Sequence, residues 1–110
     1  AGVGVGFKDA DYQSAGAVIL QTAEDIFARS ELIVKVKEPQ LDECKMLRSD
    51  QVLFTYLHLA PDPEQTAGLI NSKCIAIAYE TVTDDRGGLP LLAPMSEVAG
   101  RMSVQVGSFM

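Results

Sequence analysis

Three short runs of apolar, β-branched and aromatic residues recur along this chain, and each precedes a segment with helical spacing. They are Leu32–Val36 (LIVKV), the apolar part of Gln51–Ala60 (QVLFTYLHLA), and Cys74–Tyr79 (CIAIAY). Runs of this length and composition predict buried strands. Strands that alternate with helices, and that are too apolar to show an in–out alternation, are typical of a parallel sheet. We therefore predict an α/β fold with a mostly parallel sheet flanked by helices.

Several helices have recognisable start signals. Asp9, Thr22 and Asp62 are residue types that cap helices, and Pro63 suits a first helical position. Gln65 would complete a capping box with Asp62. The predicted helices are Ala10–Ala15, one starting after Thr22, Leu41–Arg48, one from Pro63 to about Ile70, and Ser96–Met110, with a further strand at Ala17–Leu20 (AVIL).

The last predicted helix has two different sides. One side has almost no side chain, and the opposite side is apolar. Small residues let a neighbouring backbone approach closely, at a propensity cost of about 1 kcal/mol for each interior glycine. We therefore predict that another segment packs closely against the small-residue side of this helix. The small residues are Ser96, Gly100, Ser103 and Gly107, and the apolar ones are Val98, Met102, Val106 and Phe109.

Composition excludes several classes of partner. The chain has 110 residues, enough for one domain, and a net charge of −6, which argues against binding a nucleic-acid backbone. No apolar run approaches the roughly 20 residues of a membrane span, and no leader is evident, so we expect a cytoplasmic protein. Cys44 and Cys74 are predicted to be reduced thiols, and with one histidine they are too few for a metal site. The glycine-rich Ala1–Gly6 (AGVGVG) lacks the preceding strand of a dinucleotide fingerprint.

Ionisable residues follow each of the three main predicted strands. Lys37, His58 and Glu80 lie 21 and 22 residues apart, which is one strand–helix unit at a time. Right-handed crossovers bring the ends of successive parallel strands to one edge, where ligands bind in such sheets. A lysine can hold a carboxylate or polarise a carbonyl, and a neighbouring histidine can exchange a proton with the substrate, which suits a 2-oxo acid. The alternatives are a solvated lysine, a structural histidine, and a glutamate that caps or accepts a backbone amide.

Four segments resemble the amino-terminal, substrate-binding part of bacterial L-alanine dehydrogenases. They are VKVKEP (Val34–Pro39), LFTYLHLA (Leu53–Ala60), AIAYETV (Ala76–Val82) and LPLLAPMSEVAGR (Leu89–Arg101). The resemblance implies a Rossmann- or flavodoxin-like substrate domain. It also implies the family's reaction, the reversible NAD-dependent deamination of L-alanine to pyruvate and ammonia, in an enzyme that is hexameric at full length.

The resemblance assigns roles to particular residues. By this comparison Lys37 contacts the substrate carboxylate and carbonyl, and His58 hydrogen-bonds the substrate oxygen and assists proton transfer. Tyr56 lies beside the substrate pocket. Met95 and Ser96 line the cleft near the cofactor.

The resemblance further implies that residues 1–110 are a partial, truncated substrate domain. The family's carboxylate-binding arginine, its active-site aspartate and its NAD-binding domain have no counterpart in these 110 residues. We therefore expect the 110 residues alone to be inactive. An incomplete sheet has an exposed edge, so we also expect self-association or marginal stability.

Two other relationships are compatible with the pattern. One is a saccharopine dehydrogenase-like oxidoreductase, which also uses a lysine and a histidine. The other is a non-catalytic module like the nucleotide-binding part of proton-translocating transhydrogenases. Those modules differ at the positions of Lys37 and His58, so the presence of both residues here favours catalysis.

Overall fold

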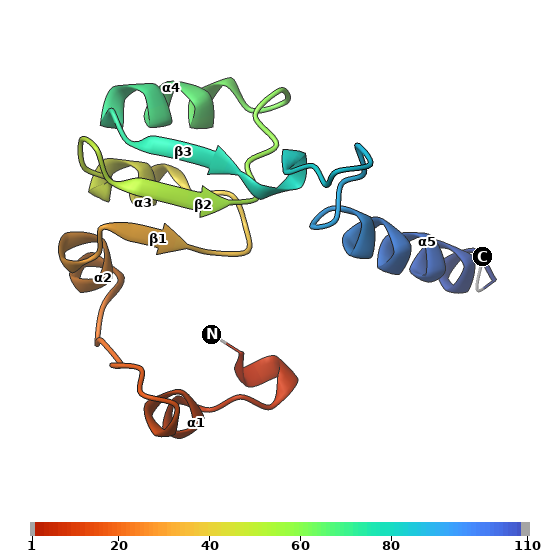
Figure 1. The fold of residues 1–110 in the computed structure, drawn as a ribbon, viewed down its shortest axis with the longest axis horizontal. Coiled ribbons are helices and arrows are strands. Elements are labelled where there is room, and N and C mark those ends of the chain that lie inside the picture. The colour runs from red at the N-terminus through yellow and green to blue at the C-terminus, as the bar shows by residue number, and fades with distance from the viewer. Residues whose placement is uncertain (1, 109–110) are drawn as a thin grey trace. The chain divides into compact units, whose positions relative to one another are not determined.

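A computed structural model describes residues 2–108, without the side chains at positions 105, 106 and 108. The chain divides into two compact units, which we call the N-terminal unit (Ala1–Ser30) and the sheet unit (Glu31–Met110). Figure 1 shows the order of helices and strands along the chain.

The N-terminal unit is built from short helical segments, η1 (Val3–Val5), α1 (Asp9–Ser14) and α2 (Ala23–Arg29). The predicted cap of α1 is wrong: Asp9 is already helical, and the backbone N–H of Lys8 donates to the Asp11 carboxylate at 2.8 Å. The predicted cap of α2 is confirmed. The Thr22 hydroxyl accepts a hydrogen bond from the Asp25 N–H at 3.2 Å.

The predicted strand at Ala17–Leu20 is wrong. These four residues form no regular secondary structure, and Val18 is 78% exposed. A strand requires a neighbouring strand to receive its backbone hydrogen bonds. In residues 2–108 no strand pairs with this segment, so its β-branched composition alone does not make it one.

The sheet unit contains a three-stranded parallel sheet in the order β1-β2-β3, as predicted. Leu53 of the central strand pairs with Ile33 on one side and Ala76 on the other. The first strand ends two residues earlier than predicted, and the chain bends at Val36 and Lys37. The strands are β1 (Leu32–Val34), β2 (Val52–Thr55) and β3 (Ile75–Ala78).

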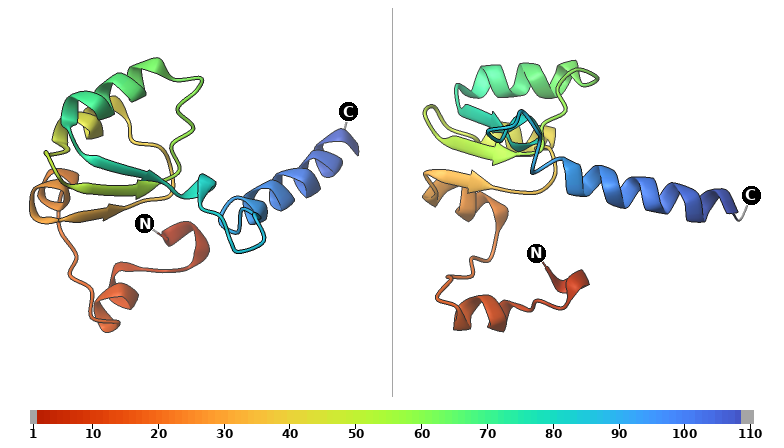
Figure 2. Two further views of the ribbon diagram at one scale, coloured as in Figure 1. Left: turned by 45° about the horizontal axis from the view of Figure 1, so that its top comes forward. Right: turned by 45° about the vertical axis from the view of Figure 1, so that its right-hand side comes forward.

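Two helices cross over between the strands, α3 (Leu41–Met46) and α4 (Pro63–Ser72). Right-handed crossovers in a sheet of this order put both helices on one face, and they pack against each other (Figure 2). The contact is close because Gly68 of α4 faces Cys44 of α3; a Cβ added at Gly68 would lie 3.1 Å from the Cys44 Cβ. Burial raises the pKa of the Cys44 thiol, which keeps the thiol neutral at this contact.

The start of α4 is only partly as predicted. The Asp62 carboxylate accepts a hydrogen bond from the Gln65 N–H at 3.0 Å, with Pro63 as the first helical residue. The Gln65 side chain does not complete a capping box. It is 1% exposed, and within residues 2–108 neither its oxygen nor its nitrogen has a hydrogen-bond partner. Packing under α4 has therefore drawn the amide into the interior and away from the cap.

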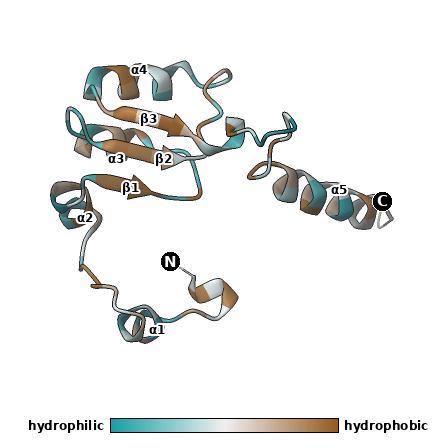
Figure 3. Cartoon of the chain, viewed as in Figure 1, coloured by the Kyte–Doolittle hydropathy of each residue, from teal (hydrophilic) through white to brown (hydrophobic). Residues whose placement is uncertain are grey.

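β1 and β2 alternate in exposure, contrary to the prediction that the strands are buried on both faces, whereas Ile75, Ala76 and Ile77 of β3 are all exposed. Ile33, Leu53 and Thr55 lie under α3 and α4 and are at most 5% exposed. The opposite face, which we call the open face, is formed by apolar residues that are half-buried or exposed, and Figure 3 shows the strands in the brown of hydrophobic residues. Its members are Leu32, Val34, Val52, Phe54, Ile75 and Ile77.

The chain after β3 passes through a 3-10 turn, η2 (Tyr79–Thr81), before the last helix, α5 (Ala93–Ser108). This helix begins three residues earlier than predicted, and the predicted end at Phe109 and Met110 lies outside the described residues. A Cβ added at Gly100 or Gly107 would meet no atom within 4 Å. The close partner predicted for the small-residue side is therefore not supplied by residues 2–108.

Candidate functional site

The carboxyl ends of the three strands lie along one edge of the sheet, because the strands are parallel and adjacent. Lys37 follows β1, His58 follows β2, and Glu80 follows β3 within η2. The structure therefore supports the predicted placement of these three residues at one edge. Their environments differ, since Lys37 and His58 are exposed and Glu80 is buried.

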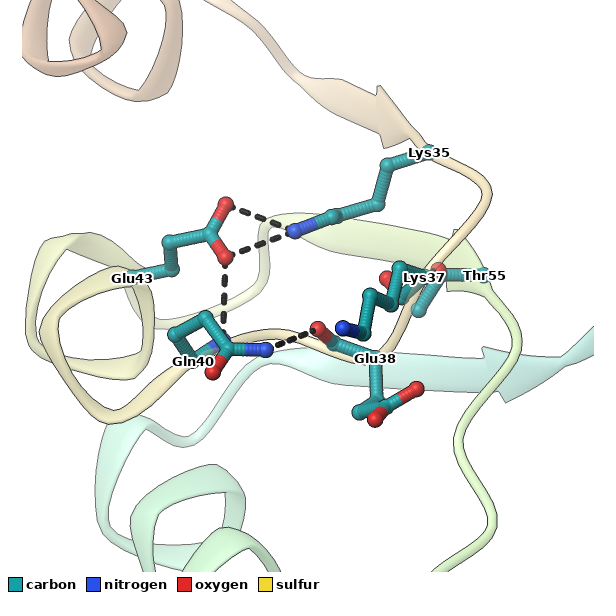
Figure 4. Close-up of polar contacts among 6 residues, drawn as sticks. All are labelled: Lys35, Lys37, Glu38, Gln40, Glu43 and Thr55. Carbon is teal, nitrogen blue, oxygen red and sulfur yellow. Dashed lines mark hydrogen bonds and ion pairs between the residues drawn. The ribbon is translucent and has the colours of Figure 1, made fainter.

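Lys37 and Lys35 lie in the same short loop but have different partners. The Lys35 ammonium group contacts both carboxylate oxygens of Glu43 at 2.6 and 2.7 Å. The same glutamate accepts the Gln40 N–H at 2.9 Å, so it also caps α3 (Figure 4). Among residues 2–108, no hydrogen bond or ion pair joins the Lys37 ammonium group to another group. Lys37 is therefore the lysine of this loop that has its charge available for a ligand.

A hydroxyl from the neighbouring strand fixes the backbone at Lys37. Thr55 is completely buried at the end of β2, and its hydroxyl donates to the Lys37 carbonyl at 2.8 Å. Thr55 was not among the residues predicted for the site. Its position could have indicated such a role. Thr55 is a polar residue at the end of an otherwise apolar run, and a buried hydroxyl needs a hydrogen-bond partner.

His58 has an unusual backbone conformation. Its φ angle is 47°, in the left-handed region that residues with a side chain seldom adopt. The Tyr56 ring stacks on the imidazole, with ring centroids 5.7 Å apart and an interplanar angle of 17°. One face of the exposed imidazole is therefore covered by an aromatic ring.

Glu80 holds the backbone that leads into His58. Its carboxylate accepts the Leu57 N–H at 3.1 and 3.0 Å and the His58 N–H at 2.9 Å. The sequence left the role of Glu80 open between a cap and a partner for a backbone amide, and the structure shows the second. Two successive N–H groups that converge on one anion resemble the backbone nests that bind anions elsewhere.

Tyr79 contacts the loop after β1 and the strand β2. Its hydroxyl donates to the Val36 carbonyl at 2.6 Å, and its ring lies edge-on to Phe54 at 5.8 Å. Val36 lies 43 residues away from Tyr79 in sequence, so the fold brings the two groups together. Burial, followed by the neighbouring Glu80 carboxylate, raises the pKa of the Tyr79 phenol above its ordinary value of 10.0. The hydroxyl therefore remains a donor at neutral pH.

An apolar groove of about 440 Å³ lies beside the ends of β1 and β2. Met95, at the start of α5, is among its lining residues, whereas Ser96, Lys37 and His58 are not. The groove is lined by Val34, Lys35, Val36, Phe54, Tyr79, Leu91 and Met95.

The described residues lack the features of two other kinds of site. Within residues 2–108, no three histidine, cysteine, aspartate or glutamate residues are grouped so that they could hold a metal ion. The same residues include no helix with the length and apolar character needed to cross a membrane.

A parallel α/β unit with ionisable groups at its strand ends defines a broad class of ligand-binding domains. The family model for the alanine dehydrogenase/PNT N-terminal domain matches residues 1–99, and the chain belongs to this family.

Individual relatives agree with the family assignment. The chain is 55% identical to an alanine dehydrogenase of Halomonas elongata over 108 residues, which are 98% of this chain. It is 52% identical to an alanine dehydrogenase of Methanococcus maripaludis over 108 residues and 50% identical to one of Mycobacterium tuberculosis over 109. A solved L-alanine dehydrogenase structure matches 96% of the chain with a TM-score of 0.86 and 52% identity. In each case the chain spans about 29% of the relative's length.

Proposed function

We propose that this chain is part of the substrate-binding domain of an NAD-dependent L-alanine dehydrogenase. The reaction is the reversible conversion of L-alanine, NAD and water to pyruvate, ammonia and NADH. The observation that carries the proposal is an unpaired ammonium group and an exposed imidazole at the ends of adjacent parallel strands, in a chain half identical to alanine dehydrogenases. We further propose a cytoplasmic homo-oligomer, a hexamer at full length, without nucleic-acid or membrane partners.

Lys37 and His58 divide the work on the substrate. The Lys37 ammonium group binds the substrate carboxylate and polarises the carbonyl oxygen, which favours attack on the carbonyl carbon. His58 gives and takes the proton on the substrate oxygen as the carbinolamine forms and collapses. Tyr56, stacked on His58, limits the positions that the imidazole can adopt.

The residues present fit one end of the cofactor only. The groove that contains Met95 is largely apolar and suits a planar ring, and Ser96 follows at the start of α5. The loops after β1 and β2 contain no glycine, and the pair Gly87 and Gly88 after β3 lacks the G-x-G-x-x-G spacing of a pyrophosphate-binding turn. We therefore assign most of NAD binding to a domain outside these 110 residues. NAD, when bound, accepts the hydride from the substrate.

The test uses the complete polypeptide that contains this chain. We expect NADH formation from L-alanine and NAD, and a fall of about 10²- to 10⁴-fold in kcat/KM for Lys37→Ala and for His58→Asn. Asparagine tolerates a left-handed backbone, so the second variant removes the imidazole with little disturbance of the loop.

Lys45→Ala is the matched control, because Lys45 is an exposed lysine on α3 outside the site. It should retain wild-type kinetics. Near-normal activity of both site variants would refute the assigned roles. Hydride transfer between NADH and NADP without alanine turnover would instead indicate the transhydrogenase-like alternative. The isolated 110 residues should form no NADH.

A further inference from the structure

Two consecutive residues after β3 each bond to a different neighbouring loop. Tyr79 donates to the Val36 carbonyl in the loop after β1, and Glu80 accepts N–H groups from the loop after β2. These are the two loops that carry Lys37 and His58. One short segment, the start of η2, therefore contacts the backbone beside both residues.

The Glu80 contact ends on the His58 backbone itself. The buried carboxylate accepts the N–H groups of Leu57 and His58, and His58 is the residue whose φ is 47°. A left-handed conformation at a residue with a side chain persists where surrounding contacts hold it. Charge-assisted hydrogen bonds to both N–H groups provide such contacts and set the direction in which the imidazole leaves the backbone.

The Tyr79 contact ends next to Lys37. The hydroxyl bonds to the carbonyl of Val36, and the following carbonyl, that of Lys37, accepts the Thr55 hydroxyl at 2.8 Å. Two successive carbonyls of the loop are thus bound by side chains from two different elements, η2 and β2. The Tyr79 ring itself contacts Phe54 and Tyr56, with centroid distances of 5.8 and 6.2 Å.

We propose that Tyr79 and Glu80 together form a brace that sets the position of Lys37 relative to His58, and that both are positioning residues for the reaction. This inference rests on the proposed function. Neither side chain needs to touch the substrate, because each acts through a backbone that bears a reacting group. Small displacements of such groups lower rates strongly.

The experiment compares Glu80→Gln and Tyr79→Phe in the complete enzyme. Gln offers one acceptor oxygen in place of two, and Phe keeps the ring but removes the hydroxyl. We expect kcat to fall on the order of 10- to 100-fold in Glu80→Gln, with an altered pH profile, because His58 is displaced. We expect KM for pyruvate to rise in Tyr79→Phe, because the Lys37 loop is displaced.

A second readout is independent of turnover. In NMR spectra, Glu80→Gln should shift the His58 imidazole signals and speed hydrogen exchange at the Leu57 and His58 amides. Glu64→Gln, at an exposed position on α4, and Tyr12→Phe, in the N-terminal unit, are matched controls that should change none of these quantities.

The outcomes separate the two proposals. Wild-type kinetics together with unchanged His58 signals in Glu80→Gln would overturn the brace. The brace would also be overturned if the loss of activity in both variants were explained entirely by a lower Tm. If the wild-type enzyme does not turn over alanine, the proposed function fails, and the imidazole and amide measurements still decide whether the brace exists.

Discussion

The backbone of His58 is a source of strain at the scale of a single residue. A side chain in the left-handed region costs about 1 kcal/mol, and glycine adopts this region without that cost. We predict that His58→Gly is more stable than His58→Ala by about 1 kcal/mol in denaturant unfolding. Equal stability of the two variants would show that the loop adopts a different conformation in solution.

Lys73 provides a matched control for this prediction. It ends α4 with a φ of 59° and lies away from the carboxyl edge of the sheet. Lys73→Gly should also be more stable than Lys73→Ala, because glycine is favoured at helix ends in this conformation. It should leave the kinetics of the complete enzyme unchanged, whereas either His58 variant should lower them.

Residue identity alone did not separate the two lysines of the loop after β1. Lys35 and Lys37 have the same charge and lie two positions apart. Lys35 forms an ion pair because Glu43 on α3 faces it, and Glu43 is oriented by the N–H of Gln40. This distinction depends on where α3 begins relative to β1, which is a property of the folded chain.

The contact between α3 and α4 is decided at the scale of elements. At Gly68 alanine would improve helix propensity by up to about 1 kcal/mol, but its Cβ would crowd Cys44 Cβ at 3.1 Å and Sγ at 3.3 Å. Overpacking costs more, typically 1–3 kcal/mol. We predict that Gly68→Ala lowers the free energy of unfolding of the protein. The same substitution should lower it less when it is made in the Cys44→Ala variant, which lacks the Sγ atom. A double-mutant cycle should give a coupling of about 0.5 kcal/mol or more.

Gly100→Ala is the corresponding control, because the added Cβ would have no neighbour within 4 Å. It should stabilise α5 by up to about 1 kcal/mol. If Gly68→Ala is stabilising as well, the two helices lie farther apart in solution than in the structure.

At the scale of the whole molecule, the most consequential feature is the open face of the sheet. Leu32, Val34, Ile75 and Ile77 are between 44% and 64% exposed and lie in two cross-strand rows with Val52 and Phe54. Exposed apolar surface of this kind favours association. In the described part of the chain, β1 and β3 also lack an outer neighbour, so both sheet edges are unpaired.

We predict that the 110-residue chain binds an apolar fluorescent dye and self-associates, and that the double variant Val34→Thr with Ile77→Thr reduces both dye binding and association. Each of these exposed substitutions should change the free energy of unfolding by about 0.5 kcal/mol or less. By contrast, Leu53→Ala, at a fully buried position, should lower it by about 2–5 kcal/mol. Dye fluorescence, sedimentation and denaturant unfolding measure these effects. Undiminished dye binding and association in the double variant would mean that another surface is responsible.

Much of the architecture was predictable because it depends on local patterns. The three apolar runs, the crossovers between them and the caps at Thr22 and Asp62 all follow from spacing within a few residues. The rule that parallel strands share a carboxyl edge was enough to place Lys37, His58 and Glu80 together. The strand predicted at Ala17–Leu20 was wrong because a strand also needs a distant partner.

Local composition and periodicity therefore determined which segments became strands and helices and which edge of the sheet carries the ionisable groups. The tertiary structure was needed to decide how those groups are held. The bonds from Tyr79 to Val36, from Glu80 to His58 and from Thr55 to Lys37 span 43, 22 and 18 residues. Contacts over such separations depend on strand register and burial, which no window of the sequence contains.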